Sequence, residues 1–302
     1  MKYGNIIRKV LGEIMIREIV ESNIGLTIKV ENFNIQQTFE CGQCFRWDQI
    51  GENHYIGIVK NKVIEIRQDA DLVYILNVKK EELAEIWSNY FDFTRDYQSL
   101  IMNISSENDV MMKATEYGKG IRILNQDEWE TLISFIISAN NNIPRIKKII
   151  QSFCEIFGDM VHYKGQKYYT FPTAEKLRGI TADDLTDIRC GYRANYIVNA
   201  VEQINSGAVD LYHLKNVDTN SARTELLKIK GVGPKVADCI LLFSMEKYDC
   251  YPMDVWIKKV TEFYYFEREA TPKEIQELAR SNWGDYAGFA QQYLFYYARN
   301  HM

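Results

Sequence analysis

The sequence predicts an α+β protein, with an N-terminal antiparallel β-sheet domain over residues 1–120 and an all-helical domain over residues 121–302. Before residue 120, short segments alternate apolar and polar side chains, as half-buried strands do. After residue 120, apolar residues recur at helical spacing, with capping residues and glycines between the runs. Because the chain has 302 residues and 46% hydrophobic content, it is long enough for two domains.

Short strands follow one another in the first domain. Apolar and polar residues alternate in Gly25-Leu-Thr-Ile-Lys-Val30, as they do along a strand with one buried face. The polar run Lys60-Asn61-Lys62 separates two further apolar segments and favours a hairpin turn. We therefore expect strands at residues 25–30, 55–59, 63–67 and 71–76, and helices at 14–23, 79–97 and 109–116.

Helix signals dominate the second domain. Asp127 can cap a helix over residues 128–139, which ends where Asn140-Asn-Asn-Ile-Pro-Arg-Ile146 favours a turn. Thr271-Pro-Lys-Glu274 has the spacing of a capping box, with proline at the first helical position. Further helices are expected to begin within residues 189–196 and to occupy residues 284–299.

A helix end, a glycine turn and a helix start follow one another near residue 230. Gly231 and Gly233 allow positive φ or close backbone approach, and Pro234 suits the first position of a helix. This order predicts a helix-hairpin-helix over residues 218–243. Its exposed N–H groups at a helix N-terminus can bind a phosphate, so Gly231, Gly233 and the nearby Lys228 are candidate ligands of DNA phosphates.

Three chemically capable residues follow this turn. Lys235 lies in the first helical turn, where the positive end of the helix dipole disfavours an ammonium and favours a nucleophilic amine. Cys239 comes one helical turn later and shares a face with Lys235. Asp254 follows Pro252 and precedes an apolar periodic run, so it can cap the next helix. The three can converge on one pocket, although each alone would equally suit a phosphate contact, a core thiol or a simple cap.

Charge and hydropathy limit the possible partners. The net charge of −5 argues against a general basic coat for nucleic acid, so DNA binding needs local clusters such as residues 223–235 and 145–148. The charged N-terminus lacks the apolar core of a signal peptide, and no apolar run approaches ~18 residues. We expect a cytoplasmic or otherwise intracellular protein, nucleoid-associated in a bacterium, that does not contact a membrane.

The cysteines and histidines do not form a recognisable metal site. Six cysteines in a chain without a secretory signal are expected to be free thiols, and the four histidines are scattered. No cysteine cluster near the C-terminus resembles an iron–sulfur ligand set. Cys41-x-x-Cys44 has the spacing of a redox motif, but it lies in a strand-rich stretch instead of a βαβ unit, so we expect no redox role.

These motifs resemble those of a known enzyme family. Gly-Val-Gly-Pro-Lys235-Val-Ala-Asp-Cys239 followed by Pro-Met-Asp254-Val is similar to the helix-hairpin-helix and Gly/Pro-Asp signature of base-excision DNA glycosylases, and Val-Ala-Asp-Cys resembles the 8-oxoguanine DNA glycosylases. The segments 41–47, 140–145 and 288–295 extend the resemblance over nearly the whole chain. One departure is Trp256, because many relatives have histidine at this position.

The resemblance implies which residues recognise the damaged base. The backbone carbonyl of Gly42 would read the lesion, because 8-oxoguanine carries a hydrogen on N7 where guanine has a lone pair, and a glycine lets the backbone come close. Gln291 and Phe295 are four residues apart on one helix face, so one would hydrogen-bond the base edge and the other would stack on its ring. Cys239 would complete this pocket.

The resemblance also implies a set of residues for the opposite strand. Asn140 would insert into the gap left by the extruded base, and Tyr192 would act as a wedge beside it. Arg145 and Arg193 would contact the orphaned partner base. Without the resemblance, these four residues suit a loop between helices, a core tyrosine and surface arginines.

The function that the resemblance implies is a bifunctional 8-oxoguanine DNA glycosylase with AP-lyase activity, in which Lys235 forms a Schiff base. Its partner would be double-stranded DNA with 8-oxoguanine opposite cytosine, and the protein would act as a monomer. No cofactor is expected, although hairpin carbonyls could hold a structural cation. Two alternatives stay open. A relative that removes other damaged bases would not need Gly42 or Gln291, and a non-catalytic helix-hairpin-helix module would not need Asp254.

Overall fold

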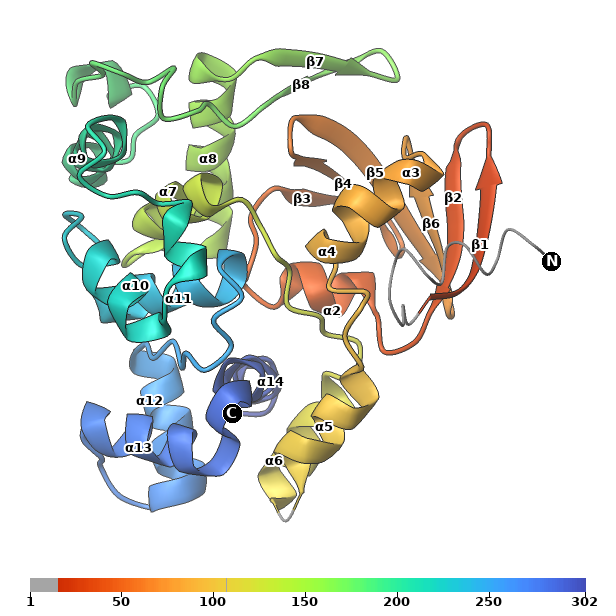
Figure 1. Cartoon of the computed structure of the whole chain (residues 1–302), viewed down its shortest axis with the longest axis vertical. Helices are drawn as coiled ribbons and strands as arrows, with labels where there is room; N and C mark the ends of the chain where they lie inside the picture. The colour runs from red at the N-terminus through yellow and green to blue at the C-terminus, as the bar shows by residue number, and fades with distance from the viewer. Residues whose placement is uncertain (1–15, 107) are drawn as a thin grey trace.

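A computed structural model describes residues 16–106 and 108–302 of the chain. An antiparallel sheet lies on one side of the molecule and most of the helices lie on the other (Figure 1). This arrangement confirms the predicted α+β class. The first dozen residues, whose charges argued against a signal peptide, lie outside the described residues.

The sheet has six strands in the order β1-β2-β6-β5-β4-β3, and every neighbouring pair is antiparallel. Lys60 and Asn61 form the β4–β5 turn with φ values of 47° and 63°, which confirms the predicted hairpin. All four predicted strands are present. The strands are β1 (Ile16–Ser22), β2 (Gly25–Val30), β3 (Trp47–Gly51), β4 (His54–Val59), β5 (Lys62–Asp69) and β6 (Leu72–Leu76).

The edge of the sheet differs from the prediction. The helix expected over residues 14–23 is wrong, because its described part forms β1, with Ile19 opposite Ile28 and Ser22 opposite Gly25. Charged residues give this segment a helix-like composition, but pairing with β2 decides its structure. The pattern also does not predict β3, whose first residue is buried and whose other four are exposed, so that no alternation marks it.

Aromatic side chains pack on one face of the sheet and fix segment 41–47. Phe39, in helix α2 (Ile35–Glu40), stacks on Trp47 of β3 with ring centroids 4.1 Å apart. Segment 41–47 therefore joins two anchored elements. The helix expected over residues 79–97 ends earlier, and it consists of α3 (Lys80–Glu82), the π-helix η1 (Leu83–Trp87) and α4 (Ser88–Tyr90).

The helical part confirms the predicted helix starts. The side chain of Asp127 accepts from the Glu130 N–H, and Thr271 and Glu274 form the expected capping box. Its helices are α5 (Tyr97–Ser105), α6 (Asp109–Tyr117), α7 (Glu128–Ser138), α8 (Ile143–Phe157), α9 (Arg193–Asn205), α10 (Thr219–Leu226), α11 (Pro234–Ser244), α12 (Val255–Thr261), α13 (Pro272–Trp283) and α14 (Ala287–His301). Shorter turns are η2 (Asp183–Leu185), η3 (His213–Asn216), the π-helix η4 (Glu262–Phe266) and η5 (Gly284–Tyr286).

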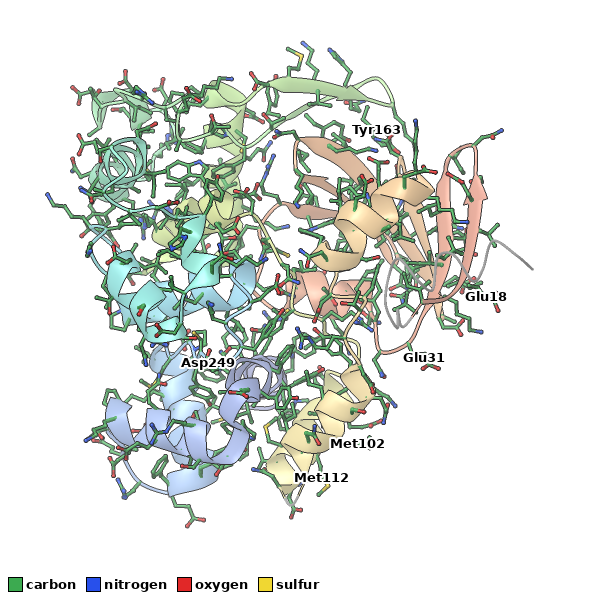
Figure 2. The ribbon with its side chains drawn as sticks, in the orientation of Figure 1. Glu18, Glu31, Met102, Met112, Tyr163 and Asp249 are labelled. Atoms are coloured by element: carbon green, nitrogen blue, oxygen red, sulfur yellow. The ribbon has the colours of Figure 1, made fainter. Side chains whose placement is uncertain are left out.

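The second domain is not all-helical as predicted, because a hairpin of β7 (Met160–Tyr163) and β8 (Gln166–Tyr169) follows α8. Lys164 and Gly165 form its turn, with φ values of 47° and 76°. Neither strand has a fully buried residue, so no alternating apolar pattern reveals the hairpin. Its tip reaches the sheet (Figure 2), where the Tyr163 hydroxyl donates to Glu65 at 3.1 Å.

Helices α5 and α6 precede residue 121 but share the core of the helical part. Tyr97, Leu100 and Met111 are buried in the same apolar cluster as α7, α11 and α14. Met102 and Met112 lie on the outer side of this helix pair (Figure 2) and are 54% and 48% exposed. The boundary at residue 121 stays a prediction.

Candidate active site

The predicted helix-hairpin-helix is formed by α10, the Gly231 turn and α11. Gly231 has φ = +87°, and a Cβ there would lie 2.5 Å from the Tyr196 ring, so both the backbone and the space require glycine. Gly233 has an ordinary φ of −91° and is the N-cap of α11, with open space around its Cα. The hairpin therefore exposes the N-terminus of α11 to solvent.

This exposed helix end has the features of an anion site. Gly233 and Pro234 are both exposed, and the first-turn N–H groups of a helix have no intrahelical acceptor. Lys228 is also exposed, and its ammonium contacts both oxygens of Glu225 at 2.6 and 2.7 Å. A phosphate at the hairpin would have to compete with Glu225 for this lysine. The roles of Lys228, Gly231 and Gly233 in phosphate binding stay predictions.

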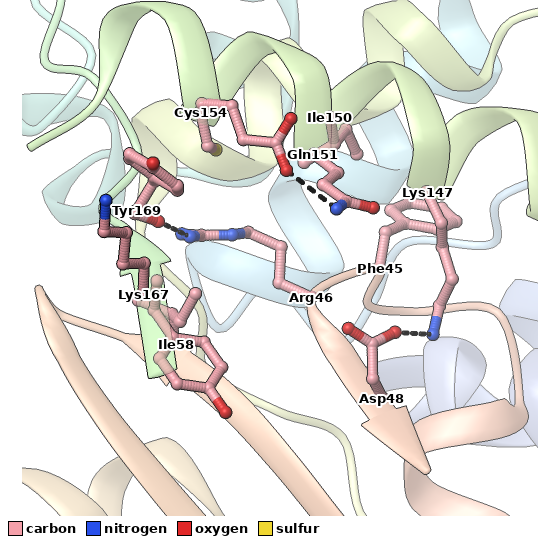
Figure 3. Close-up of a pocket in the computed structure, with 12 residues that line it drawn as sticks. Phe45, Arg46, Asp48, Ile58, Lys147, Ile150, Gln151, Cys154, Lys167 and Tyr169 are labelled. Atoms are coloured by element: carbon pink, nitrogen blue, oxygen red, sulfur yellow. Dashed lines mark hydrogen bonds and ion pairs between the residues drawn. The ribbon is translucent and has the colours of Figure 1, made fainter. Parts of the chain in front are cut away.

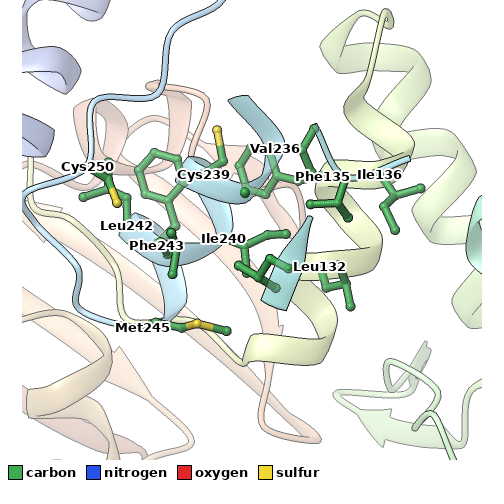
Figure 4. Packing of buried hydrophobic residues seen from close by; sticks show 14 of the residues in the cluster. Leu132, Phe135, Ile136, Val236, Cys239, Ile240, Leu242, Phe243, Met245 and Cys250 are labelled. Carbon is green, nitrogen blue, oxygen red and sulfur yellow. The ribbon is translucent and has the colours of Figure 1, made fainter. Parts of the chain in front are cut away.

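Lys235 and Cys239 share one face of α11, as predicted. The Lys235 amine lies 5.2 Å from the centroid of the Phe135 ring, and Phe135 stacks on Phe243 with centroids 5.6 Å apart. Burial raises the pKa of the Cys239 thiol to about 11, while the neighbouring Lys235 acts in the opposite direction. The thiol is therefore protonated at neutral pH. Figure 4 shows Cys239 above the apolar packing between α7 and α11.

Asp254 begins α12 as predicted. One of its carboxylate oxygens accepts the Ile257 N–H at 2.7 Å, so this side chain caps the helix and stays near its positive end. Two residues later, the Trp256 indole N–H is buried without a hydrogen-bond partner among the described residues. This tryptophan occupies the position at which the sequence departs from the family pattern.

One cavity brings most of these residues together. Its volume is about 60 Å³. Gln291 is 5% exposed, and its Oε1 has no hydrogen-bond partner among the described residues. A ligand with an N–H group would satisfy this atom. The lining residues are Cys41, Gly42, Phe135, Lys235, Cys239, Phe243, Pro252, Asp254, Gln291, Gln292 and Phe295.

Gly42 forms a turn with positive φ at the wall of this cavity. Its φ is +87°, and a Cβ there would lie 3.5 Å from the Phe295 ring. The flanking Cys41 and Cys44 are buried free thiols, and burial raises the pKa of both, which disfavours the thiolate that redox chemistry needs. The backbone of the turn therefore lies near the Phe295 ring. Cys41 and Cys44 form no disulfide.

The residues expected to fill the gap in DNA lie together on the surface. Asn140 is exposed and has φ = +50°, in the turn between α7 and α8. Tyr192 is 52% exposed, and its hydroxyl donates to the Ala139 carbonyl at 3.4 Å. The two side chains therefore project from neighbouring backbone segments.

The two arginines have different environments. Arg145 is exposed in the first turn of α8, and its guanidinium forms no hydrogen bond or ion pair with the residues that the structure describes. Arg193 is 3% exposed and donates to the carbonyls of Ala139, Asn140 and Cys190. Its donors are engaged in bracing the Asn140 turn, so Arg193 would have to leave these carbonyls before it could contact a base as expected.

A second cavity lies between the sheet, α8 and β8, away from Lys235 (Figure 3). Its volume is about 210 Å³, and its charged residues are largely paired. Arg46 contacts Glu130 at 3.1 Å and donates to the Tyr169 carbonyl, and Lys147 contacts Asp48 at 2.9 Å. These pairs join the two parts of the chain, so we attribute a structural role to the cavity wall.

The described residues provide neither a metal-binding cluster nor a membrane-spanning helix. No group of three or more His, Cys, Asp or Glu residues in that part of the chain could hold a metal ion. None of the described helices is long and apolar enough to span a membrane. All six cysteines are free and buried.

Comparison with protein families agrees with this geometry. Residues 25–132 match the 8-oxoguanine DNA glycosylase N-terminal domain, and residues 133–285 match the HhH-GPD superfamily of base excision DNA repair proteins. The chain belongs to the 8-oxoguanine DNA glycosylase family. The two matches meet between Leu132 and Ile133, within α7.

Relatives of the same family resemble the chain over most of its length. The N-glycosylase/DNA lyase OGG1 of Arabidopsis thaliana is 31% identical over 85% of this chain and 75% of the relative. A probable N-glycosylase/DNA lyase of Methanothermobacter thermautotrophicus is 28% identical over 91% of this chain and 96% of the relative.

Solved structures give the same result. The 8-oxoguanine glycosylase/lyase of Clostridium acetobutylicum, in complex with double-stranded DNA containing cytosine opposite 8-oxoguanine, is 43% identical with a TM-score of 0.92, covering 95% of this chain and 99% of that one. A 3-methyladenine DNA glycosylase of Archaeoglobus fulgidus shares the fold alone, at 18% identity and a TM-score of 0.74 over 91% of this chain and 98% of that one.

Sequence reasoning missed several residues of the site. Phe135, Phe243 and Pro252 line the cavity, and their apolar character made them indistinguishable from core residues. Gln292 was also missed, although a second buried glutamine beside Gln291 on an apolar helix is unusual enough to mark it.

Proposed function

We propose that the chain is a bifunctional DNA glycosylase and AP lyase that excises 8-oxoguanine from duplex DNA with a preference for cytosine opposite the lesion. The observation that carries this proposal is that Gly42, Lys235, Asp254, Gln291 and Phe295, from distant parts of the chain, line one cavity. An enzyme that acts on a base inside a duplex has to extrude it into such a pocket. Membership of the 8-oxoguanine DNA glycosylase family supports the same conclusion.

Lys235 is the proposed nucleophile. The lone pair of its amine bonds to C1′ of the deoxyribose while the bond from C1′ to N9 breaks, and the base leaves with that electron pair and takes up a proton. The C1′–O4′ bond then opens, O4′ is protonated, and the nitrogen loses a proton to give the Schiff base. Loss of a C2′ proton forms a double bond and expels the 3′ phosphate. This sequence accounts for both the glycosylase and the lyase steps.

Asp254 is the proposed electrostatic partner. As the bond to the base breaks, positive charge develops on the sugar, and a fixed carboxylate lowers the energy of that state more than it lowers that of the substrate. The Ile257 N–H donates to Asp254 at the N-terminus of α12, and this hydrogen bond holds the carboxylate in place. The same carboxylate thus caps α12 and is placed for the proposed electrostatic role.

Recognition of the lesion is assigned to Gly42, Gln291 and Phe295. The N7–H of 8-oxoguanine would donate to the Gly42 carbonyl, whereas the N7 lone pair of guanine would repel it. The unpartnered Oε1 of Gln291 would accept an N–H from the base edge, and Phe295 would stack on its ring. Cys239, a protonated thiol, would pack on the other side.

Recognition of the partner strand is assigned to Asn140, Tyr192 and Arg145. Cytosine offers acceptors at N3 and O2, which suit a guanidinium that can only donate, whereas adenine presents an amino donor. Arg145 is exposed and has no ion-pair partner among the described residues, so it fits this role in the free protein, whereas Arg193 would contribute only after release from the Asn140 turn.

The direct test is excision on defined duplexes. Single-lesion duplexes with 8-oxoguanine opposite cytosine, an oxidised pyrimidine or 3-methyladenine are incubated with the protein, with and without borohydride. We expect strand cleavage and a borohydride-trapped adduct on the 8-oxoguanine duplex. Preferential action on another lesion would favour the alternative glycosylase, and binding without cleavage on any duplex would favour the non-catalytic module.

A further inference from the structure

Two glutamine side chains hold the backbone on both sides of Gly42. The Gln292 amide donates to the Cys41 carbonyl at 2.7 Å, and the Gln126 amide donates to the Gln43 carbonyl at 2.7 Å. Gln292 comes from α14 and Gln126 from the segment before α7, so the contacts join three distant parts of the chain. The carbonyl between the two anchored ones belongs to Gly42.

The Gln43 side chain adds a third restraint. It is fully buried, and its amide donates to the carbonyls of Thr38 and Arg122 while its oxygen accepts the Leu124 N–H. The Gly42 carbonyl itself accepts no hydrogen bond from the residues that the structure describes. The neighbouring groups are thus anchored, and the carbonyl proposed to read the base remains available.

We infer that Gln292 and Gln126 are positioning residues that fix the orientation of the Gly42 carbonyl and thereby set discrimination at N7. This inference rests on the proposed function, because it assumes that Gly42 reads the lesion. A carbonyl distinguishes an N7–H from an N7 lone pair only if it keeps its direction. A free peptide would tilt away from the lone pair and relieve the repulsion, and it would also bond the N7–H less well.

The surroundings of Gln292 indicate that its side chain positions the Cys41 carbonyl and does more than fill space in the core. It is 3% exposed, and its amide is placed beside the cavity instead of in solvent. A buried amide in a largely apolar helix is unfavourable unless it is hydrogen-bonded, and its donor contact is the Cys41 carbonyl. Methionine at this position would keep the length and volume of the side chain and remove the donor.

The test is a binding comparison on three duplexes of one sequence. One carries 8-oxoguanine, one carries 8-bromoguanine, which has a large C8 substituent but keeps the N7 lone pair, and one carries guanine as the baseline. Dissociation constants are measured for Lys235→Gln protein, which prevents turnover, and for the same protein with Gln292→Met or Gln126→Met. The control is Gln68→Met in β5, away from the cavity. It removes a glutamine that donates to the Phe33 carbonyl at 2.7 Å and to the Ala70 carbonyl at 3.0 Å, and that accepts the Ile35 N–H at 2.9 Å. Thermal unfolding of each variant monitors folding.

We expect Gln292→Met and Gln126→Met to lower the preference for 8-oxoguanine over 8-bromoguanine by about threefold to tenfold, the range for loss of one neutral hydrogen bond. In Gln68→Met the preference for 8-oxoguanine over 8-bromoguanine should stay unchanged. The inference would be overturned if Gln292→Met and Gln126→Met both kept the preference for 8-oxoguanine over 8-bromoguanine. An equal loss of that preference in Gln68→Met would overturn it as well. If Gln292→Met fails to fold, the half-buried Gln126→Met decides alone. A Lys235→Gln protein without any preference would overturn the proposed function, and the inference with it.

Discussion

The Nε atom of Arg223 lies 2.7 Å from a carboxylate oxygen of Asp238, and this ion pair joins α10 to α11 across the hairpin. The Asp238 side chain is 5% exposed, and burial raises its pKa while Arg223 opposes that rise. Asp238 stands between Lys235 and Cys239 on α11, on the side that faces α10. The pair therefore fixes the helix that carries the proposed nucleophile.

Removal of Arg223 should destabilise the protein strongly. Arg223→Met leaves the Asp238 carboxylate buried without its partner, and we expect the free energy of unfolding to fall by about 3 kcal/mol. Chemical denaturation measures this change. The matched control is Lys273→Met, which breaks an exposed pair with Glu277 whose atoms are 3.9 Å apart, and should cost less than about 1 kcal/mol. Equal losses in the two variants would contradict the proposed anchoring role.

Lys235→Gln should abolish the chemistry and preserve the complex. The substitution removes the amine but keeps a polar side chain of similar reach in the first turn of α11. We expect lesion-duplex binding to persist, with no borohydride-trapped adduct and no strand cleavage. Gel-shift and trapping assays on the same preparation check both parts. A trapped adduct in this variant would move the nucleophile to another residue.

Asp254 variants should separate charge from capping. Asp254→Asn keeps an acceptor for the Ile257 N–H but removes the charge, so we expect base excision to slow on the order of a hundredfold with near-normal DNA binding. Asp254→Ala should in addition lose about 1 kcal/mol of stability with the cap. Single-turnover excision rates and thermal unfolding distinguish the two effects. Equal excision by wild type and the Asn variant would remove the electrostatic role.

Arg145 should govern the choice of partner base. Loss of one charge-assisted hydrogen bond costs roughly 1.5–3 kcal/mol, so Arg145→Met should narrow the preference for cytosine by about tenfold to a hundredfold. The loss should appear mainly as slower or weaker action on the cytosine duplex. Rates and affinities for the lesion opposite each of the four bases test this. If wild type and Arg145→Met ranked the four opposite bases in the same order and with the same differences in rate and affinity, Arg145 would not read the partner base.

Lys228 should contribute to affinity without selectivity. A phosphate contact carries no base information, so Lys228→Ala should weaken binding to damaged and undamaged duplexes alike and reduce the slope of log K against log salt by about one. Because Lys228 is paired with Glu225, Glu225→Gln should strengthen binding to both duplexes. Titrations at several salt concentrations measure the slopes. A loss confined to lesion DNA would exclude a phosphate contact.

Local features of the site were predictable from sequence, and distant contacts were not. Lys235, Cys239 and Asp254 owe their positions to a glycine turn, a proline and a helix cap, all of which are encoded within a few residues. The engagement of Arg193 with the Asn140 turn depends on where two helices pack, which no local pattern shows. The same holds for Gln292, whose partner is 251 residues away.

The errors in the fold have a related cause. Strand β1 has helix-like composition and becomes a strand because β2 offers a pairing edge. The register that places Ile19 of β1 opposite Ile28 of β2 is set by this pairing and not by the local sequence. Hairpin β7–β8 lacks a buried face, and its turn at Lys164 and Gly165 was the sole local signal. Where side chains alternate over a buried face, as in β2 and β6, the pattern and the structure agree.

The bond between Gln292 and Cys41 also affects the order in which the protein can mature during synthesis. A ribosome makes the Gly42 turn long before α14, so the turn lacks one of its two flanking anchors until Gln292 has emerged. The hairpin and Lys235 are complete well before that point. A chain cut short within α13 would thus carry the proposed phosphate ligands and the proposed nucleophile, but one of the two anchors beside the Gly42 carbonyl would be missing.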